Sequence, residues 1–191
     1  MVIEIDVVSV SARQDGIPVD LPPRELALLT SLAIGPKVWP SYQLVPLLWP
    51  QAKASRCTSL KVYIHRLRRR LGPGVISSTN KGYELASNTI VDLWEARLLL
   101  GKRTLSETQR QTLSRFYSRA LSADRSYLSR WDWFSGAETL ITSAISEVAL
   151  RLARDASMRD MREEAATIMR SAASLNPSET RLHDWQNLAI S

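Results

Sequence analysis

The hydrophobic residues at the start of the chain follow the two-residue period of a β-strand. Residues 2–10 read VIEIDVVSV, in which apolar and polar positions alternate at first, and this pattern predicts a single strand. Asp15-Gly16 is a turn signal, so residues 17–19 are expected to return as a short partner strand. The chain is therefore predicted to open with a small antiparallel β-element.

Three helical segments are predicted next, each with apolar residues three or four positions apart. The first begins at Pro22-Pro23, since proline suits a first helical turn, and ends at Gly35-Pro36. The second covers Tyr42–Trp49, with Ser41 as the expected N-cap. The third covers residues 57–71, and at about 100° per residue its apolar side chains form one narrow stripe. That stripe consists of Leu60, Ile64, Leu67 and Leu71.

A short hairpin is predicted after the third helix. Gly72-Pro73-Gly74 ends that helix, residues 75–78 have the composition of a strand, and residues 83–85 form the returning strand. The polar segment Thr79–Gly82 is the expected turn between them. Three helices followed by a two-stranded hairpin is the order of elements in a winged helix-turn-helix fold.

The rest of the chain has the pattern of helices that pack in pairs. The predicted helices cover residues 91–100, 106–121, 138–156, 161–175 and 179–190, and residues 127–134 carry an aromatic cluster. Amphipathic pairs with alanine at close-packing positions are typical of tetratricopeptide-like hairpins. We therefore predict a mostly α fold with small β-elements. Residues 1–86 form a winged-helix domain in this prediction, residues 87–191 form a tetratricopeptide-like helical domain, and residues 87–89 are a polar joint.

The positive charge of the chain is concentrated in one third of its length. The net charge is +6, and the segment from Leu26 to Tyr83 contains nine Lys or Arg residues and no Asp or Glu. Such a segment favours a polyanionic partner. A membrane-surface helix would need bulky apolar residues beside its basic face, and residues 57–71 lack them. Nucleic acid is therefore the expected partner, and no membrane contact is expected.

The polar side of the third helix carries residue types that read DNA. Arg and Lys bind phosphates and guanine edges, whereas Ser, Thr and Val reach base edges and thymine methyl groups. The polar hairpin tip suits a phosphate or the minor groove. For His65, Arg68 and Arg70, a solvated surface is the alternative to a DNA contact. The predicted DNA contacts are Thr58, Ser59, Lys61, Val62, His65, Arg66, Arg68, Arg69, Thr79, Asn80 and Lys81.

Catalysis, metal binding and membrane insertion have little support in the sequence. The histidines are His65 and His183, and no carboxylate pair stands at a catalytic spacing. The single cysteine, Cys57, excludes an internal disulfide and is expected to be a packing residue. No signal peptide is expected, and the sequence contains no apolar run of about 18 residues. We expect a cytoplasmic protein with no enzymatic activity, cofactor or metal.

Residues 21–85 resemble the OmpR/PhoB-type winged-helix DNA-binding domain. The matching segments are LPPRELALLTSLA, YQLVPLLW, SLKVYIHRLRRRLG and NKGYEL, which occur in the family's order and at its separations. The resemblance implies groove-facing roles for Thr58, Ser59, Val62, His65 and Arg66, with Arg68 near a phosphate. His65 stands where the family often has Arg, and the hairpin lacks the family's Arg-Gly-x-Gly-Tyr form.

The helical part is similar to a shortened bacterial transcriptional activation domain, the module that follows an OmpR-type winged helix in SARP-type activators. The similarity is carried by Ala120-Leu121, Trp131-Asp132-Trp133, Glu164-Ala165 and Leu175–Glu179. It implies that the helical domain forms a homodimer or contacts a partner protein, with RNA polymerase as a candidate.

The sequence thus predicts a transcription regulator that binds double-stranded DNA sequence-specifically. Residues 57–71 would enter the major groove, with the hairpin on the backbone or in the minor groove. The alternative is a protein-interaction adaptor that keeps a winged-helix fold and docks an acidic protein or RNA polymerase. Small and hydroxyl residues beside arginine favour DNA, whereas large exposed apolar residues would favour a protein.

Overall fold

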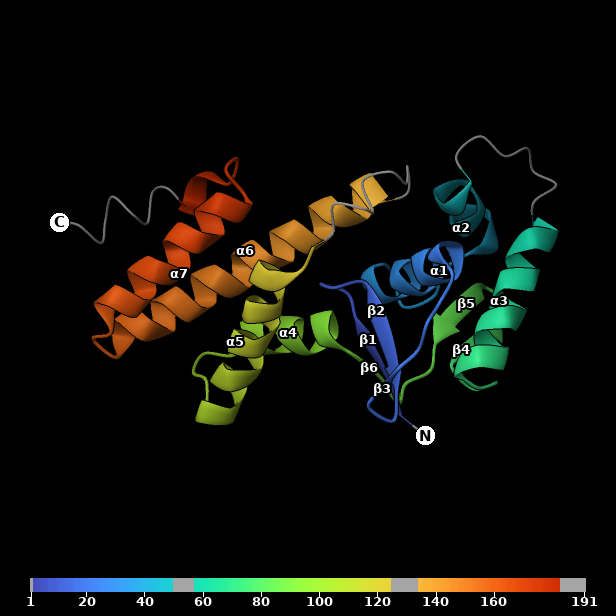
Figure 1. Ribbon diagram of the computed structural model, residues 1–191, viewed down its shortest axis with the longest axis horizontal. Coiled ribbons are helices and arrows are strands. Elements are labelled where there is room, and N and C mark those ends of the chain that lie inside the picture. Colours follow the sequence, from blue (N-terminus) through green and yellow to red (C-terminus); the bar gives the residue numbers. More distant parts are fainter. Residues whose placement is uncertain (1, 50–56, 125–133, 183–191) are drawn as a thin grey trace. The chain divides into compact units, whose positions relative to one another are not determined.

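The computed structural model of the chain describes residues 2–49, 57–124 and 134–182. The chain divides into two compact units, of which the first continues to Leu93 and the second contains α5, α7 and α6 from Thr139 onward. The elements, labelled as in Figure 1, are β1 (Ile3–Asp6), β2 (Ser11–Gln14), β3 (Ile17–Pro18), α1 (Pro23–Ile34), α2 (Ser41–Leu48), α3 (Cys57–Leu71), β4 (Ile76–Thr79), β5 (Gly82–Leu85), β6 (Thr89–Val91), α4 (Asp92–Leu100), α5 (Glu107–Ser122), α6 (Phe134–Met158) and α7 (Arg162–Leu175). The prediction of a mostly α fold with small β-elements is confirmed.

The first strand is shorter than its sequence pattern predicts. The prediction of one strand over residues 2–10 is wrong, because β1 ends at Asp6 and β2 returns antiparallel to it. Val7 and Val8 are both fully buried, so the alternation of inward and outward side chains stops there. The carboxylate of Asp6 accepts the backbone N–H of Ser9 at 2.8 Å, which holds the chain in the turn.

A strand from the end of the first unit completes the N-terminal sheet, whose order is β3-β2-β1-β6. β6 pairs in parallel with β1, with Ile3 opposite Thr89 and Ile5 opposite Val91. The prediction of residues 87–89 as a polar joint is therefore wrong at Thr89, which is buried in the sheet. The first unit extends beyond residue 86 because of this pairing.

Asp92 ties the start of α4 to the N-terminal sheet. Its side chain is buried, and Oδ1 accepts the backbone N–H of Val7 at 2.9 Å. The same oxygen accepts the N–H of Leu93 at 2.7 Å, in the first turn of α4. One carboxylate thus satisfies backbone donors of two segments, which is the usual condition for burying a charged group.

The three predicted helices of the first unit form at the expected positions. α1, α2 and α3 pack against one another, and Figure 1 shows them grouped beside the β4–β5 hairpin. α2 begins at Ser41, and its N-cap is Pro40, so the prediction of Ser41 as the N-cap is wrong by one residue. Pro40 has an extended backbone, which leaves Ser41 to begin the helix. Pro46 lies inside α2.

The hairpin is hydrogen-bonded to the segment between α1 and α2. The N–H of Trp39 donates to the carbonyl of Tyr83 at 2.8 Å, and the N–H of Tyr83 donates back at 2.9 Å. Gly82 makes this approach feasible because a Cβ at this position would collide with the Trp39 carbonyl. Its φ of +145° also lies outside the range that other residues favour.

The second unit contains helices joined by polar contacts between them. Arg110 Nε of α5 donates to Asp155 of α6 at 2.6 Å, and the hydroxyl of Tyr117 donates to the carbonyl of Ile168 in α7 at 2.8 Å. α6 and α7 form an antiparallel hairpin (Figure 1), closed by a hydrogen bond from Asn176 to Ser146 at 3.0 Å. The aromatic cluster at residues 127–134 and the last predicted helix lie largely outside the described residues.

Gly82→Ala is expected to destabilise the first unit by about 1–3 kcal/mol, because it combines an unfavourable φ with a collision against Trp39. The matched control is Gly74→Ala, since nothing lies within 4 Å of a Cβ there, and its effect should stay within about 0.5 kcal/mol. Urea unfolding followed by circular dichroism measures both. Equal stability of the two variants would contradict the role given to Gly82.

The stability of the second unit should fall at alkaline pH through Tyr117. Burial raises the pKa of Tyr117 to about 12 from 10.0. The unfolded chain therefore loses this proton first, so the stabilisation is complete below pH 10 and is lost as the pH rises to about 12. The slope is about 1.4 kcal/mol per pH unit. The free energy of unfolding, measured between pH 9 and pH 12, should fall more steeply in the wild type than in Tyr117→Phe. Parallel curves for the two proteins would contradict this role of Tyr117.

Candidate nucleic-acid interface

The helix α3 has one buried side and one exposed side, as its sequence pattern predicts. Its apolar stripe is at most 2% exposed and consists of Leu60, Ile64, Leu67 and Leu71. The opposite side is exposed and carries Lys61, Val62, His65, Arg66 and Arg69. α3 packs against α1 and α2, and burial of this stripe fixes which residues face solvent. Ser59 is half-buried, and the side chain of Thr58 is outside the described part of the structure.

Arg68 is bound to the hairpin rather than extended into solvent. Its Nε donates to the carbonyl of Ile76 at 2.8 Å, and Nη2 donates to the hydroxyl of Ser78 at 2.8 Å. Both partners belong to β4. The predicted DNA contact at Arg68 therefore competes with two hydrogen bonds within the protein, and the clear structural role of this residue is to hold the hairpin against α3.

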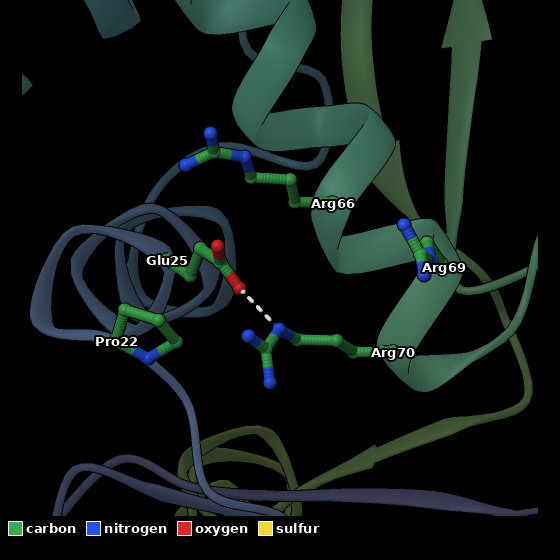
Figure 2. A pocket seen from close by; sticks show the side chains of 5 residues that line it. All are labelled: Pro22, Glu25, Arg66, Arg69 and Arg70. Atoms are coloured by element: carbon green, nitrogen blue, oxygen red, sulfur yellow. Dashed lines mark ion pairs between the residues drawn. The ribbon is translucent and has the colours of Figure 1, made fainter.

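Arg70 is also occupied within the protein. Its Nε lies 3.1 Å from Oε2 of Glu25, whose side chain is 1% exposed, and Figure 2 shows this ion pair between α3 and α1. Nη1 of Arg70 also donates to the carbonyl of Asp20 at 3.4 Å. A buried carboxylate needs a partner to compensate for its lost hydration. Arg70 therefore neutralises Glu25 and ties the end of α3 to the beginning of α1.

Arg66 and Arg69 remain available for an external anion. Among the residues that the structure describes, neither has an acidic partner. Together with Arg70 they line a hollow of about 480 Å³, which Pro22 and Glu25 border from the α1 side (Figure 2). Because Glu25 is paired with Arg70, two of the three arginines retain uncompensated charge at this hollow. The arrangement suits a phosphate or the acceptor edge of a base.

The hairpin tip offers fewer free groups than its sequence suggests. Thr79 Oγ1 accepts the backbone N–H groups of Lys81 and Gly82, both at 3.1 Å. This hydroxyl therefore stabilises the turn, although Thr79 was predicted to contact DNA. Asn80 and Lys81 are exposed at the same tip.

A row of aromatic and cationic side chains beside α3 was missed by sequence reasoning. The guanidinium carbon of Arg66 lies 5.4 Å from the ring centroid of Tyr63. Tyr63 packs against Trp49, with centroids 5.6 Å apart, and Arg24 lies 5.7 Å from the Trp49 ring. The spacing of Tyr63 and Arg66 within a helix could have indicated the first contact. Trp49 and Arg24 come from other elements, so no local signal indicates them.

Other kinds of site find no support in the described residues. Within them, no cluster of three or more His, Cys, Asp or Glu side chains suits a metal ion. No helix in the same part of the chain combines the length and apolar character needed to cross a membrane.

No match to the chain was found among curated proteins. Among solved structures, the chain is similar to Mycobacterium tuberculosis EmbR in complex with a low-affinity phosphopeptide, with 17% sequence identity and a TM-score of 0.46. The similarity covers 94% of this chain and 66% of that chain, so this chain spans slightly less than two thirds of the length of the EmbR chain.

Part of the first unit matches a known protein family. Residues 16–85 match the family model described as "Transcriptional regulatory protein, C terminal". The matched segment contains α1, α2, α3 and the β4–β5 hairpin, which carry the motifs of the OmpR/PhoB-type resemblance. Its family consists of transcription regulators rather than enzymes. Residues 16–85 therefore match the family of C-terminal DNA-binding domains of transcriptional regulatory proteins.

Proposed function

We propose that this chain binds double-stranded DNA sequence-specifically, with α3 in the major groove. The observation that supports this most directly is the exposed side of α3, which presents Arg66 and Arg69 without acidic partners among the described residues. A groove of B-form DNA admits one helix and is lined by phosphates on both sides. A rigidly packed helix with free guanidinium groups fits that environment.

Different residues of α3 would read different parts of the DNA. Val62 is 44% exposed, although it is apolar, and its methyl groups suit the methyl group of thymine. Arg66 and His65 lie next to it on the helix and are assigned to base edges. Lys61 and Arg69 are assigned to phosphates, which fix the register of the helix without reading sequence. Ser59, with Thr58 before it, would approach the bases from the beginning of the helix.

The hairpin would contact the DNA backbone or the minor groove through Asn80 and Lys81, which are exposed at its tip. Thr79 and Arg68 would support this contact from within the protein, because both are hydrogen-bonded to the hairpin itself. The hairpin thus contributes one charge and one amide to the interface, and α3 contributes the rest.

We assign dimer formation or contact with a partner protein to the helical second unit, with RNA polymerase as a candidate partner. The paired helices α6 and α7, joined through Asn176 and Ser146, support a tetratricopeptide-like module. Its resemblance to bacterial transcriptional activation domains supports the same role. A DNA-binding domain with such a module would act in the cytoplasm as a transcription regulator.

Arg66→Ala is expected to weaken binding to a duplex selected from random DNA at least about tenfold, because a bidentate base contact contributes about 1–3 kcal/mol. Arg13→Ala is the matched control, since Arg13 is exposed on β2, outside α3 and the hairpin. Mobility-shift titration measures affinity, and thermal unfolding confirms that both variants fold. Wild-type affinity should also fall steeply with salt. Absence of binding to any duplex, even at low salt, would instead support the protein-interaction adaptor.

Substitutions of Arg69 and Arg70 should affect different properties, although the two residues are neighbours. Arg69→Ala should weaken binding to all duplexes alike and reduce the salt slope by about one unit, with stability unchanged. Arg70→Met should reduce the free energy of unfolding by about 1–3 kcal/mol, because it leaves Glu25 buried without its partner.

Adding Glu25→Gln should recover part of the loss in Arg70→Met, since the two residues act as one pair. Urea unfolding and salt-dependent binding distinguish the two effects. Similar losses of stability in the Arg69 and Arg70 variants would show that the structural role given to the Arg70–Glu25 ion pair is incorrect.

A further inference from the structure

Four side chains from three parts of the first unit form a continuous row. Arg24 of α1 lies over Trp49, which follows the last residue of α2, and Trp49 packs on Tyr63 of α3. Tyr63 in turn lies against the guanidinium of Arg66, 5.4 Å from its carbon to the ring centroid. The two rings are tilted by 49°, within the range of arrangements that aromatic pairs prefer.

The side chains of this row differ in burial. Trp49 is 6% exposed and belongs to the core, whereas Tyr63 is half-buried and Arg66 is exposed. Tyr63 therefore connects a buried ring to an exposed cation. The face of an aromatic ring attracts a guanidinium group electrostatically and by stacking. Among the described residues, no acidic group competes for Arg66, because Glu25 at the same hollow is paired with Arg70.

Restricting the conformation of an arginine side chain affects its phosphate contacts and its base contacts differently. A phosphate can be bound from many directions, because it presents several equivalent acceptor oxygens. A guanine edge needs the planar fork of the guanidinium in one orientation. An arginine that is already ordered in the free protein loses less conformational freedom on binding. Ordering Arg66 should therefore favour base recognition more than general attraction to DNA.

We propose that Tyr63, backed by Trp49, is a positioning residue that orders the guanidinium of Arg66 for sequence readout. This inference rests on the proposed function of α3. Tyr63 itself need not contact DNA in this role, and it would determine specificity through Arg66. Removing the ring should lower affinity for the specific duplex and leave affinity for random duplex nearly unchanged.

The test uses the full chain with Tyr63→Phe, which keeps the ring, and with Tyr63→Leu and Tyr63→Gln, which remove it. The specific duplex is one selected from random DNA by the wild type. Tyr63→Phe should bind it within about twofold of the wild type, and both ring-less variants should bind about 3–30-fold more weakly, the range expected for loss of a cation–π contact. Random duplex should be bound within about twofold by all variants. A loss in Tyr63→Phe equal to that in Tyr63→Leu would overturn the role of the ring.

A double-variant cycle then asks whether Tyr63 acts through Arg66. In the Arg66→Ala background, Tyr63→Leu should weaken specific binding by less than about twofold, since the group that it orders is absent. If Tyr63→Leu weakens specific binding as much in the Arg66→Ala background as in the wild type, the inference is overturned and the proposed function stays intact. A wild type that binds no duplex would overturn both.

A second readout needs no DNA. The ring of Tyr63 should shift the Nε–Hε proton resonance of Arg66, which is identified by its disappearance in Arg66→Ala. The shift should persist in Tyr63→Phe and vanish in Tyr63→Leu and Tyr63→Gln. An Arg66 resonance that is the same with and without the ring would overturn the inference even if DNA binding is normal.

Discussion

The burial of one apolar stripe determines what the first unit can present to a partner. Leu60, Ile64, Leu67 and Leu71 fill the side of α3 that faces the interior, and each fully buried side chain of this kind contributes about 1.5–3 kcal/mol. A rotation of α3 about its axis would expose part of this stripe and bury a charged residue in its place. The orientation of the basic side is thus a consequence of hydrophobic packing, and the charges themselves have little part in setting it.

Features that depend on neighbouring residues could be predicted from the sequence, whereas those that depend on distant pairing could not. The two sides of α3, the hairpin and the turn at Asp15-Gly16 all follow from local periodicity and turn chemistry. The early end of β1 and the pairing of β6 depend on contacts between remote segments. Thr89 is polar and was predicted to lie in a joint, yet it is buried because it pairs with Ile3 of β1.

The candidate site shows the same limit at the level of single side chains. Arg68, Arg69 and Arg70 are adjacent residues of one type, and the partners of the first and third come from β4 and α1. Sequence reasoning could therefore predict a basic surface of the correct composition, and it could not separate the cation that faces solvent from the two that hold the protein together. The helical spacing of Tyr63 and Arg66 was an available signal, whereas the position of Trp49 required the fold.

The parallel pairing of β6 with β1 has a consequence for the order in which the chain folds. β1 leaves the ribosome first, but its neighbour β6 follows only after the three helices and the hairpin have been synthesised. Contacts between segments close in sequence form quickly, and pairings between distant segments form late. We therefore expect the helices to assemble around α3 before the sheet is complete. The edge of β1 that pairs with β6 would then be among the last parts of the first unit to become ordered, whereas its other edge pairs with the nearby β2.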